Sequence, residues 1–377
     1  MGTATATFVE IAKARRWRAF DWQLLLYVVL LVGFGAVMGY SANYQVIGGG
    51  GLSQTVKTLI WTSIGLTLFF VAANIDYHWL QTFATPIYLV VLALLLATGL
   101  IGRNLFGAQM SISVAGIDFQ FSEISKVLMI VVLGAFLASR REKIGRLSTI
   151  VGAGLLMAVP TYLVYRQPDL GTALVFVAIL LGMLFMSGAG VGWLALLGGV
   201  TVAIAPIAVG ALAAYQRQRL FCFLDPSADP QGACYQVVQA LNTVGSGGLL
   251  GQGLTAGRQN QLGFLPVQST DFIFTVVAEE LGLVGGMILL ALFALLIWRV
   301  LNVGWGARDP FGANIAAGLG SLLVFQIAVN IGMVTGIMPV TGIPLPFITY
   351  GGSSMISLLF GMGLLQSVRV HAWKPTF

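Results

Sequence analysis

The segment FLPVQSTDFIF, residues 264–274, places Asp271 where a long polar stretch meets more than twenty mostly apolar residues. An aspartate there suits a helix N-cap, because its carboxylate accepts hydrogen bonds from the free amides of the first turn. Glu279 and Glu280 follow about 12–14 Å further along the same helix, at ~1.5 Å per residue. Two adjacent carboxylates at that depth must face protein, pair or carry a proton. The sequence therefore predicts a polar interior beside Asp271, and leaves open whether this residue only starts a helix or also reacts.

A second polar group lies in FQFSEISKVLMI, where Glu123 and Lys126 are three residues apart. That spacing places both on one helix face, where they are able to pair. One interpretation is a structural ion pair that makes partial burial tolerable; the other is a cation held ready for an anionic substrate. In RQPDLGTALV, Asp169 follows Pro168, which suits an N-cap. Both segments carry charge that a membrane makes costly, so both are candidate functional sites.

The segment YQRQRLFCFLDP places Arg217 and Arg219 among polar and aromatic residues. Such arginines are either interfacial anchors or a phosphate-binding pair. The glycine-rich stretch 245–257 has two interpretations as well. Its backbone amides are able to approach an anion, or its glycines supply backbone conformations with positive φ.

These residues are set in a chain built for a membrane. Of its 377 residues, 58% are hydrophobic and only 8% are charged, whereas a soluble protein usually carries about a quarter charged residues. Apolar runs such as 22–40 and 311–337 are long enough to cross a bilayer as helices and too long for barrel strands. The composition predicts an all-α polytopic membrane protein with a single transmembrane domain, residues 1–377.

Ten membrane spans are predicted, and their loops set the orientation. The predicted spans are 22–42, 55–74, 80–101, 122–139, 148–165, 172–187, 191–213, 271–298, 311–336 and 347–368. With the N-terminus in the cytoplasm, most lysines and arginines fall on the cytoplasmic side, as the positive-inside rule requires. We therefore expect both termini in the cytoplasm. The candidate residues above then gather at the outer face of the membrane.

The longest connection, residues 214–270 between spans seven and eight, falls on the outer side. Its apolar side chains predict a folded extracellular loop with a short helix near 235–243. Cys222 and Cys234, the two cysteines, both lie in this loop. The sequence leaves open whether they form a disulfide or stay free, because it does not supply their separation. The net charge of +6 follows from the topology and calls for no nucleic acid.

Several segments together resemble the SEDS family of shape, elongation, division and sporulation proteins, also called the FtsW/RodA/SpoVE family. The similar segments are RQPDLGTALV, YQRQRL, FLDPSADPQGACYQ, GSGGLLGQGL, QLGFLPVQSTDFIFTVVAEELG and GIMPVTGIPLPFITYGGSSMISLLFGMGLL. They cover nearly the whole chain in the family's order. GSGG, QLGFLP and VTGIPLPF are more similar to the RodA-type elongation members than to the division members.

The resemblance implies a ten-helix peptidoglycan glycosyltransferase of the bacterial plasma membrane that polymerises lipid II for cell elongation and rod shape. The implied partners are lipid II, the growing lipid-linked glycan, a class B penicillin-binding protein and membrane proteins of the elongation complex. The family's catalytic aspartate corresponds to Asp271, and its acid and lysine at the head of span four correspond to Glu123 and Lys126. In the family, Pro-Glu-x-His-Thr-Asp commonly precedes span eight. Here Val267 and Ser269 replace the glutamate and the histidine.

The implied reaction inverts an α-linked pyrophosphate donor to a β-1,4 bond and releases undecaprenyl pyrophosphate, so a single displacement suffices. Asp271 is then the general base. Lys126, Arg217 and Arg219 are expected to bind the leaving group, with Glu123 positioning Lys126 and with Asp169, Glu279 and Glu280 supporting the site. No covalent nucleophile is required; no cofactor is certain, and the sequence leaves a divalent cation open. The alternative function is a lipid II transporter, although transporters tend to bind substrate near the midplane and to contain internal repeats.

Overall fold

Long helices dominate the structure, a computed structural model, and they follow the predicted spans closely. The structure describes residues 19–43, 50–105, 108–114, 117–210, 212, 214–232, 234–262 and 270–372. Its ten long membrane-region helices are α2 (Trp22–Ala42), α3 (Gly50–Asn74), α5 (Ala84–Ile101), α6 (Phe121–Ser139), α7 (Leu147–Arg166), α8 (Leu170–Met186), α9 (Val191–Gly210), α13 (Ile273–Trp305), α14 (Pro310–Val334) and α15 (Gly352–Ala372). Each one corresponds to one predicted span.

The length and apolar composition of the helices support the assignment of a membrane protein. Seven of the described helices are long and apolar enough to cross a bilayer. The remaining three predicted spans correspond to shorter apolar helices, Ala84–Leu100, Leu170–Met186 and Val191–Ile204. The prediction of an all-α polytopic membrane protein is confirmed.

Aspartates begin three of these helices. Asp21, Asp169 and Asp309 precede α2, α8 and α14, and each side chain accepts a hydrogen bond from a backbone amide of the first turn. Such caps satisfy donors that have no partner within the helix. Pro310 occupies the first turn of α14, where its missing N–H costs nothing.

Several span boundaries differ from the prediction by a few residues, and the largest differences include the end of α13 and the start of α15. Helix α13 continues to Trp305, past the predicted end at residue 298. Helix α15 begins at Gly352 rather than at residue 347. The reason for the late start is local, because Pro344 and Pro346 remove amide donors and Phe347 has a φ of 63°. The chain therefore forms an irregular segment between α14 and α15.

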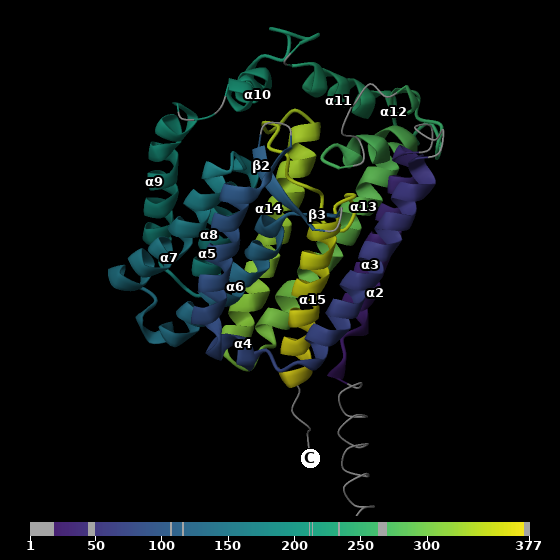
Figure 1. Cartoon of the computed structure of the whole chain (residues 1–377). Coiled ribbons are helices and arrows are strands. Elements are labelled where there is room, and N and C mark those ends of the chain that lie inside the picture. The colour runs from purple at the N-terminus through teal and green to yellow at the C-terminus, as the bar shows by residue number, and fades with distance from the viewer. Residues whose placement is uncertain are drawn as a thin grey trace, which may run out of the picture.

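The long loop between spans seven and eight, called the outer loop after its predicted side, is folded, as predicted. It contains α10 (Ala214–Leu224), α11 (Tyr235–Ser246) and α12 (Arg258–Gln261), and these lie together at one end of the bundle (Figure 1). Helix α11 confirms the helix expected near 235–243. A disulfide joins Cys222 of α10 to Cys234 just before α11, which settles the alternative that the sequence left open.

Short elements complete the chain. Helix α4 (His78–Thr82) precedes α5, and a 3-10 turn at Arg141–Lys143 follows α6. Between α5 and α6, β1 (Arg103–Leu105), β2 (Ala108–Val114) and β3 (Ile117–Phe119) form an antiparallel sheet in the order β1-β2-β3. Sequence analysis missed this sheet, because strands of three to seven residues carry little periodicity.

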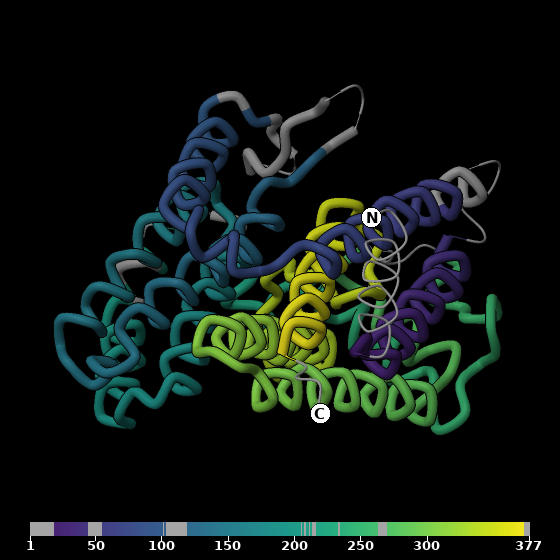
Figure 2. Tube along the Cα trace, turned by 90° about the horizontal axis from the view of Figure 1, so that it is seen from below, coloured from purple at the N-terminus to yellow at the C-terminus, as the bar shows by residue number. Residues whose placement is uncertain are grey.

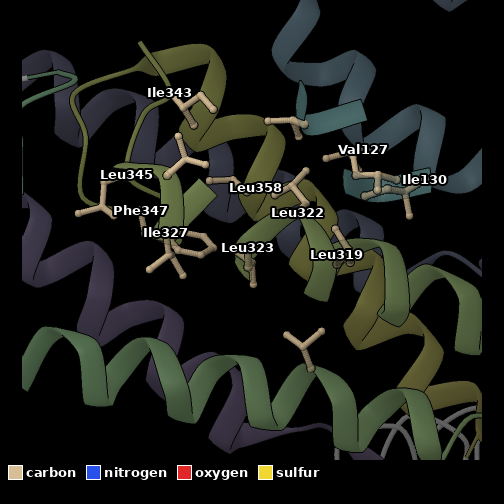
Figure 3. Packing of buried hydrophobic residues seen from close by; sticks show 14 of the residues in the cluster. Val127, Ile130, Leu319, Leu322, Leu323, Ile327, Ile343, Leu345, Phe347 and Leu358 are labelled. Atoms are coloured by element: carbon tan, nitrogen blue, oxygen red, sulfur yellow. The ribbon is translucent and has the colours of Figure 1, made fainter. Parts of the chain in front are cut away.

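Helix α14 is the centre of the bundle. It packs against α6, α8 and α13, while α15 packs mainly against α3 and α6. Seen from below, α14 and α15 lie between α5–α9 on one side and α2, α3 and α13 on the other (Figure 2). The buried side chains shown at this centre (Figure 3) include Val127, Ile130, Leu319, Leu322, Leu323, Ile327, Ile343, Leu345, Phe347 and Leu358. The irregular segment after α14 is thus part of the core.

The glycine-rich stretch docks onto a kink in α13. Gly282 has a φ of 66° inside this helix, and the amides of Leu283 and Val284 donate to the carbonyls of Gly248 and Leu249. A Cβ added to Gly251 would lie 2.2 Å from the carbonyl oxygen of Glu280. Close backbone approach and positive φ therefore explain these glycines, and the loop is fixed to the helix that begins beside Asp271.

Candidate active site

Asp271 lies just before α13 rather than in its cap position. The helix begins at Ile273, and Phe272 occupies the N-cap without a side-chain cap bond. The N-cap interpretation of Asp271 is therefore wrong, which leaves its carboxylate available for other contacts. The side chain keeps some accessible surface, as a group that meets a substrate must.

The surroundings of Asp271 raise the pKa of its carboxyl group. Burial raises the pKa of Asp271 to about 6, and the nearby carboxylates of Asp169 and Glu123 raise it further, while the Arg219 guanidinium opposes them. These interactions place side chains from α6, α10 and the start of α8 around Asp271. A carboxyl group with a pKa near neutrality is a stronger base than an ordinary aspartate.

Glu123 and Lys126 form the predicted pair on α6. Lys126 Nζ lies 2.7 Å from Glu123 Oε1, and both residues are buried, with 2% and 4% of their surface exposed. Burial raises the pKa of Asp169, and the nearby positive charge of Lys126 opposes that rise, so the pair faces the same polar region as Asp271. The ion pair is confirmed, and a contact of Lys126 with substrate stays a prediction.

Asp169 performs the capping role predicted for it. Its Oδ1 accepts a hydrogen bond of 2.9 Å from the amide of Thr172, and its Oδ2 accepts one of 3.3 Å from Gln120 Nε2. Burial raises its pKa. Asp169 thus both starts α8 and adds negative charge next to Asp271.

The two arginines of α10 have different surroundings. The side chain of Arg217 is exposed, and its Nη2 donates to the carbonyls of Gly210 and Leu212 at the end of α9, at 3.2 and 3.3 Å. Arg219 is close enough to Asp271 to lower its pKa. Of the predicted pair, Arg219 is therefore the one that interacts with Asp271.

Glu279 and Glu280 anchor the outer loop. Glu279 accepts hydrogen bonds of 2.7 and 3.0 Å from the amides of Gln259 and Asn260 at α12. Glu280 accepts from the Ser41 hydroxyl of α2 at 2.6 and 2.7 Å. Both glutamates are fully buried. The polar interior predicted from these acids exists, and its hydrogen bonds join α2, α12 and α13.

Sequence analysis missed Asn330 and Gly342. Asn330 Nδ2 on α14 donates to the backbone carbonyl of Asp271 at 2.9 Å, and a Cβ on Gly342 would lie 3.4 Å from Asp271 Oδ2. An asparagine in a long apolar run marks a candidate functional residue, because polar groups in membrane helices are costly. The sequence around Asn330 carries this signal.

The residues present do not mark a metal centre. Within the described part of the chain, no group of three or more His, Cys, Asp or Glu side chains is arranged to hold a metal ion.

Comparison with known proteins agrees with this arrangement. A family model described as "Cell cycle protein", that of the FtsW/RodA/SpoVE proteins, matches residues 22–374. The peptidoglycan glycosyltransferase MrdB of Escherichia coli K12 is 40% identical over 355 residues, which cover 93% of this chain and 94% of that protein. Stage V sporulation protein E of Bacillus subtilis is 35% identical and covers 92% of this chain and 96% of its own length.

Solved structures share the fold. A chain from a peptidoglycan synthase complex, described as coordinating polymerization and crosslinking, superposes with a TM-score of 0.80 at 30% identity, over 94% of this chain and 99% of its own. The rod shape determining protein RodA of Thermus thermophilus gives a TM-score of 0.72 at 29% identity, over 95% and 99%. A family model that spans almost the whole chain, relatives of matching length and a shared helix bundle lead to one conclusion: the chain belongs to the FtsW/RodA/SpoVE family.

Proposed function

We propose that this protein is a peptidoglycan glycosyltransferase that polymerises lipid II into glycan strands and releases undecaprenyl pyrophosphate. The observation that carries the proposal is Asp271, a partly accessible carboxylate with a pKa of about 6 beside a cluster of charged side chains. The relatives named peptidoglycan glycosyltransferase support it. We assign to the side chains around Asp271 each group that a single inverting displacement needs.

In the proposed reaction, the 4-hydroxyl of one lipid-linked disaccharide attacks the anomeric carbon of another lipid-linked chain. The C–O bond to the pyrophosphate breaks as the new glycosidic bond forms, and the hydroxyl proton passes to Asp271. An acceptor of this kind typically contributes 10²–10⁴-fold to the rate. Inversion needs one such step, so no covalent enzyme intermediate is required.

Positive side chains offset the charge of the departing pyrophosphate. Arg219 interacts electrostatically with Asp271, and Lys126 is held by Glu123 in the same polar region. Both are assigned to the leaving group, with Arg217 as an outer contact. A hydrogen-bonded, partly dry site makes such charges more effective than they are in water.

The remaining acids support this arrangement. Asp169 starts α8 and is hydrogen-bonded to Gln120 beside Glu123. Glu279 and Glu280 hold the outer loop against α13 and α2. Through these bonds the part of the loop around α12 is kept against α13 and α2.

We further assign the site to the outer face of a bacterial plasma membrane, with both termini in the cytoplasm. The positive-inside distribution of Lys and Arg supports this orientation. A related chain belongs to a synthase complex that coordinates polymerization and crosslinking. By analogy, the partner here is a class B penicillin-binding protein within an elongation complex.

The test is polymerisation of purified lipid II by the reconstituted protein. Wild type is expected to form glycan strands, whereas Asp271→Asn, which keeps the size and loses the base, is expected to be about 10²–10⁴-fold slower. Both proteins must elute alike in detergent, and the assay is run with and without a class B partner and a chelator.

A parallel measurement of lipid II movement across vesicles separates the enzyme from a transporter. Lipid movement without glycan product in wild type, or near-normal polymerisation by Asp271→Asn, would overturn the proposal.

A further inference from the structure

Asn330 is a buried amide at the centre of the bundle. It lies on α14 with no exposed surface, in a helix that is otherwise mainly apolar. Its Nδ2 donates two hydrogen bonds, one of 2.9 Å to the carbonyl oxygen of Asp271 and one of 2.7 Å to that of Ile343. One side chain thus joins the start of α13 to the segment that follows α14.

The chemistry of the two acceptors fixes the orientation of this amide. Both are carbonyl oxygens, so only the nitrogen end of the amide is able to face them. The nitrogen has two hydrogens, and each has one acceptor. A leucine of similar size would fill the space and make neither bond.

The segment held by Asn330 lies against Asp271 and against the start of α8. At Gly342 an added Cβ would lie 3.4 Å from Asp271 Oδ2, and at Gly171 it would lie 2.6 Å from the carbonyl oxygen of Thr341. Gly171 belongs to the first turn of α8, which Asp169 caps. Residues 341–343 therefore contact the Asp271 carboxylate and the capped end of α8.

The oxygen of the Asn330 amide differs from the nitrogen, because it lacks a hydrogen bond within the described part of the chain. Asn330 Oδ1 is buried and accepts no hydrogen bond among the described residues. A buried acceptor without a partner costs about 1–3 kcal/mol. A leucine would remove this unpaired oxygen but would also leave the carbonyl oxygens of Asp271 and Ile343 without their Nδ2 donor, so the two hydrogen bonds account for the asparagine.

We propose that Asn330 is a positioning residue that fixes the Asp271 carboxylate against residues 341–343 and so sets the rate of glycosyl transfer. The claim about rate rests on the proposed function. The claim about position does not, since it concerns only the local order of two segments. A displacement of about 1 Å in a reacting group is able to lower a rate by about 10²-fold.

Gln326 supplies a matched control. It lies one turn earlier on α14, is 1% exposed, and neither atom of its amide has a hydrogen-bond partner among the described residues. Asn330→Leu and Gln326→Leu therefore make similar changes in one helix. Only the first removes a contact with Asp271.

The experiment measures kcat and KM for lipid II polymerisation by the full-length protein, with hydrogen exchange of the purified variants. Asn330→Leu is expected to lower kcat by about 10- to 100-fold. KM is expected to change by less than roughly threefold. Exchange is expected to rise at residues 270–275 and 341–345. Gln326→Leu is expected to match wild type in both.

Asn330→Ser keeps one hydrogen and is expected to give an intermediate kcat. If Asn330→Leu does not fold, the kcat and exchange of Asn330→Ser test the positioning role instead. Wild-type kcat in Asn330→Ser together with unchanged exchange, or an equal loss in Gln326→Leu, would overturn the positioning role. Should wild type itself fail to polymerise lipid II, the proposed function fails, and the exchange data still judge the position of Asp271.

Discussion

At the scale of single residues, the site depends on how burial and charge act on one carboxylate. Asp271 is partly buried and lies near two other acids, so its pKa is raised. Arg219 limits this effect, because a cation favours the ionised form. The balance leaves Asp271 largely ionised at neutral pH while making it more basic than an exposed aspartate.

The pH dependence of the rate follows from this balance. The base must be ionised to accept a proton, so activity is expected to be low below pH 6 and to rise through a pKa of about 6. The measurement is kcat/KM for lipid II polymerisation between pH 4.5 and 8. A profile without an acid limb in that range would contradict the role of Asp271.

Replacing Arg219 shifts that profile in a known direction. Arg219→Gln removes the charge that lowers the pKa of Asp271, so the acid limb is expected to move to higher pH. Arg217→Gln is the matched control, because Arg217 contacts the carbonyls of Gly210 and Leu212 instead. Equal shifts in both variants would show that the effect is not specific to the pair of Arg219 and Asp271.

At the scale of elements, the loop and helix around the kink of α13 act as one unit. Gly282 interrupts the helix with a φ of 66°, and the backbone of residues 248–253 forms hydrogen bonds with the exposed backbone groups there. Only glycine tolerates this conformation together with so close an approach. The kink therefore decides where the first turns of α13, and Asp271 before them, point.

A methyl group at the kink is expected to disturb this unit. In Gly282→Ala, the new Cβ would lie 2.3 Å from the amide nitrogen of Gly251, and its backbone strain alone costs about 1–3 kcal/mol. The check is the thermal midpoint in detergent together with protease cleavage of the outer loop. Gly33→Ala, where an added Cβ meets nothing within 4 Å, should leave both unchanged.

The disulfide between Cys222 and Cys234 is a second constraint on the outer loop. It closes a stretch of 12 residues between α10 and α11, for which chain entropy suggests about 3 kcal/mol. A double variant, Cys222→Ser with Cys234→Ser, is expected to unfold at lower temperature and to be insensitive to reductant. Wild type should fall to the same midpoint when reduced, and equal midpoints before reduction would refute a stabilising role.

At the scale of the whole molecule, the elements that carry the candidate residues meet at one end of the bundle. The outer loop with α10, α11 and α12 covers the end at which α8 and α13 begin, while α4 and the end of α15 lie at the other (Figure 1). Helix α14 runs through the centre and contacts α6, α8 and α13. This arrangement supports the proposed site at one membrane surface.

The orientation of that end is open to a labelling test. In intact spheroplasts, a membrane-impermeant maleimide is expected to label Arg258→Cys in the outer loop and not Lys143→Cys in the turn after α6. Both positions are exposed, so access decides the result. Permeabilised cells provide the control for Lys143→Cys, and labelling of that variant in intact spheroplasts would invert the proposed topology.

The sequence by itself determined the membrane class, the ten spans and the candidate acids. Long apolar runs are costly in water, and charged residues are costly in lipid, so both are visible without coordinates. The pairing of Glu123 with Lys126 followed from their spacing along one helix, and the capping by Asp169 followed from its place after Pro168 at the start of a span. These properties are local or compositional.

Only the tertiary structure decided which candidates meet. Arg217 and Arg219 are equivalent as sequence, yet only Arg219 interacts with Asp271, because the end of α9 supplies carbonyls to Arg217. The bond from Asn330 to Asp271 spans 59 residues, and no periodicity reports a contact of that range. The disulfide likewise depended on a separation in space. Contacts between distant segments depend on how the helices pack, and that packing is a property of the whole bundle.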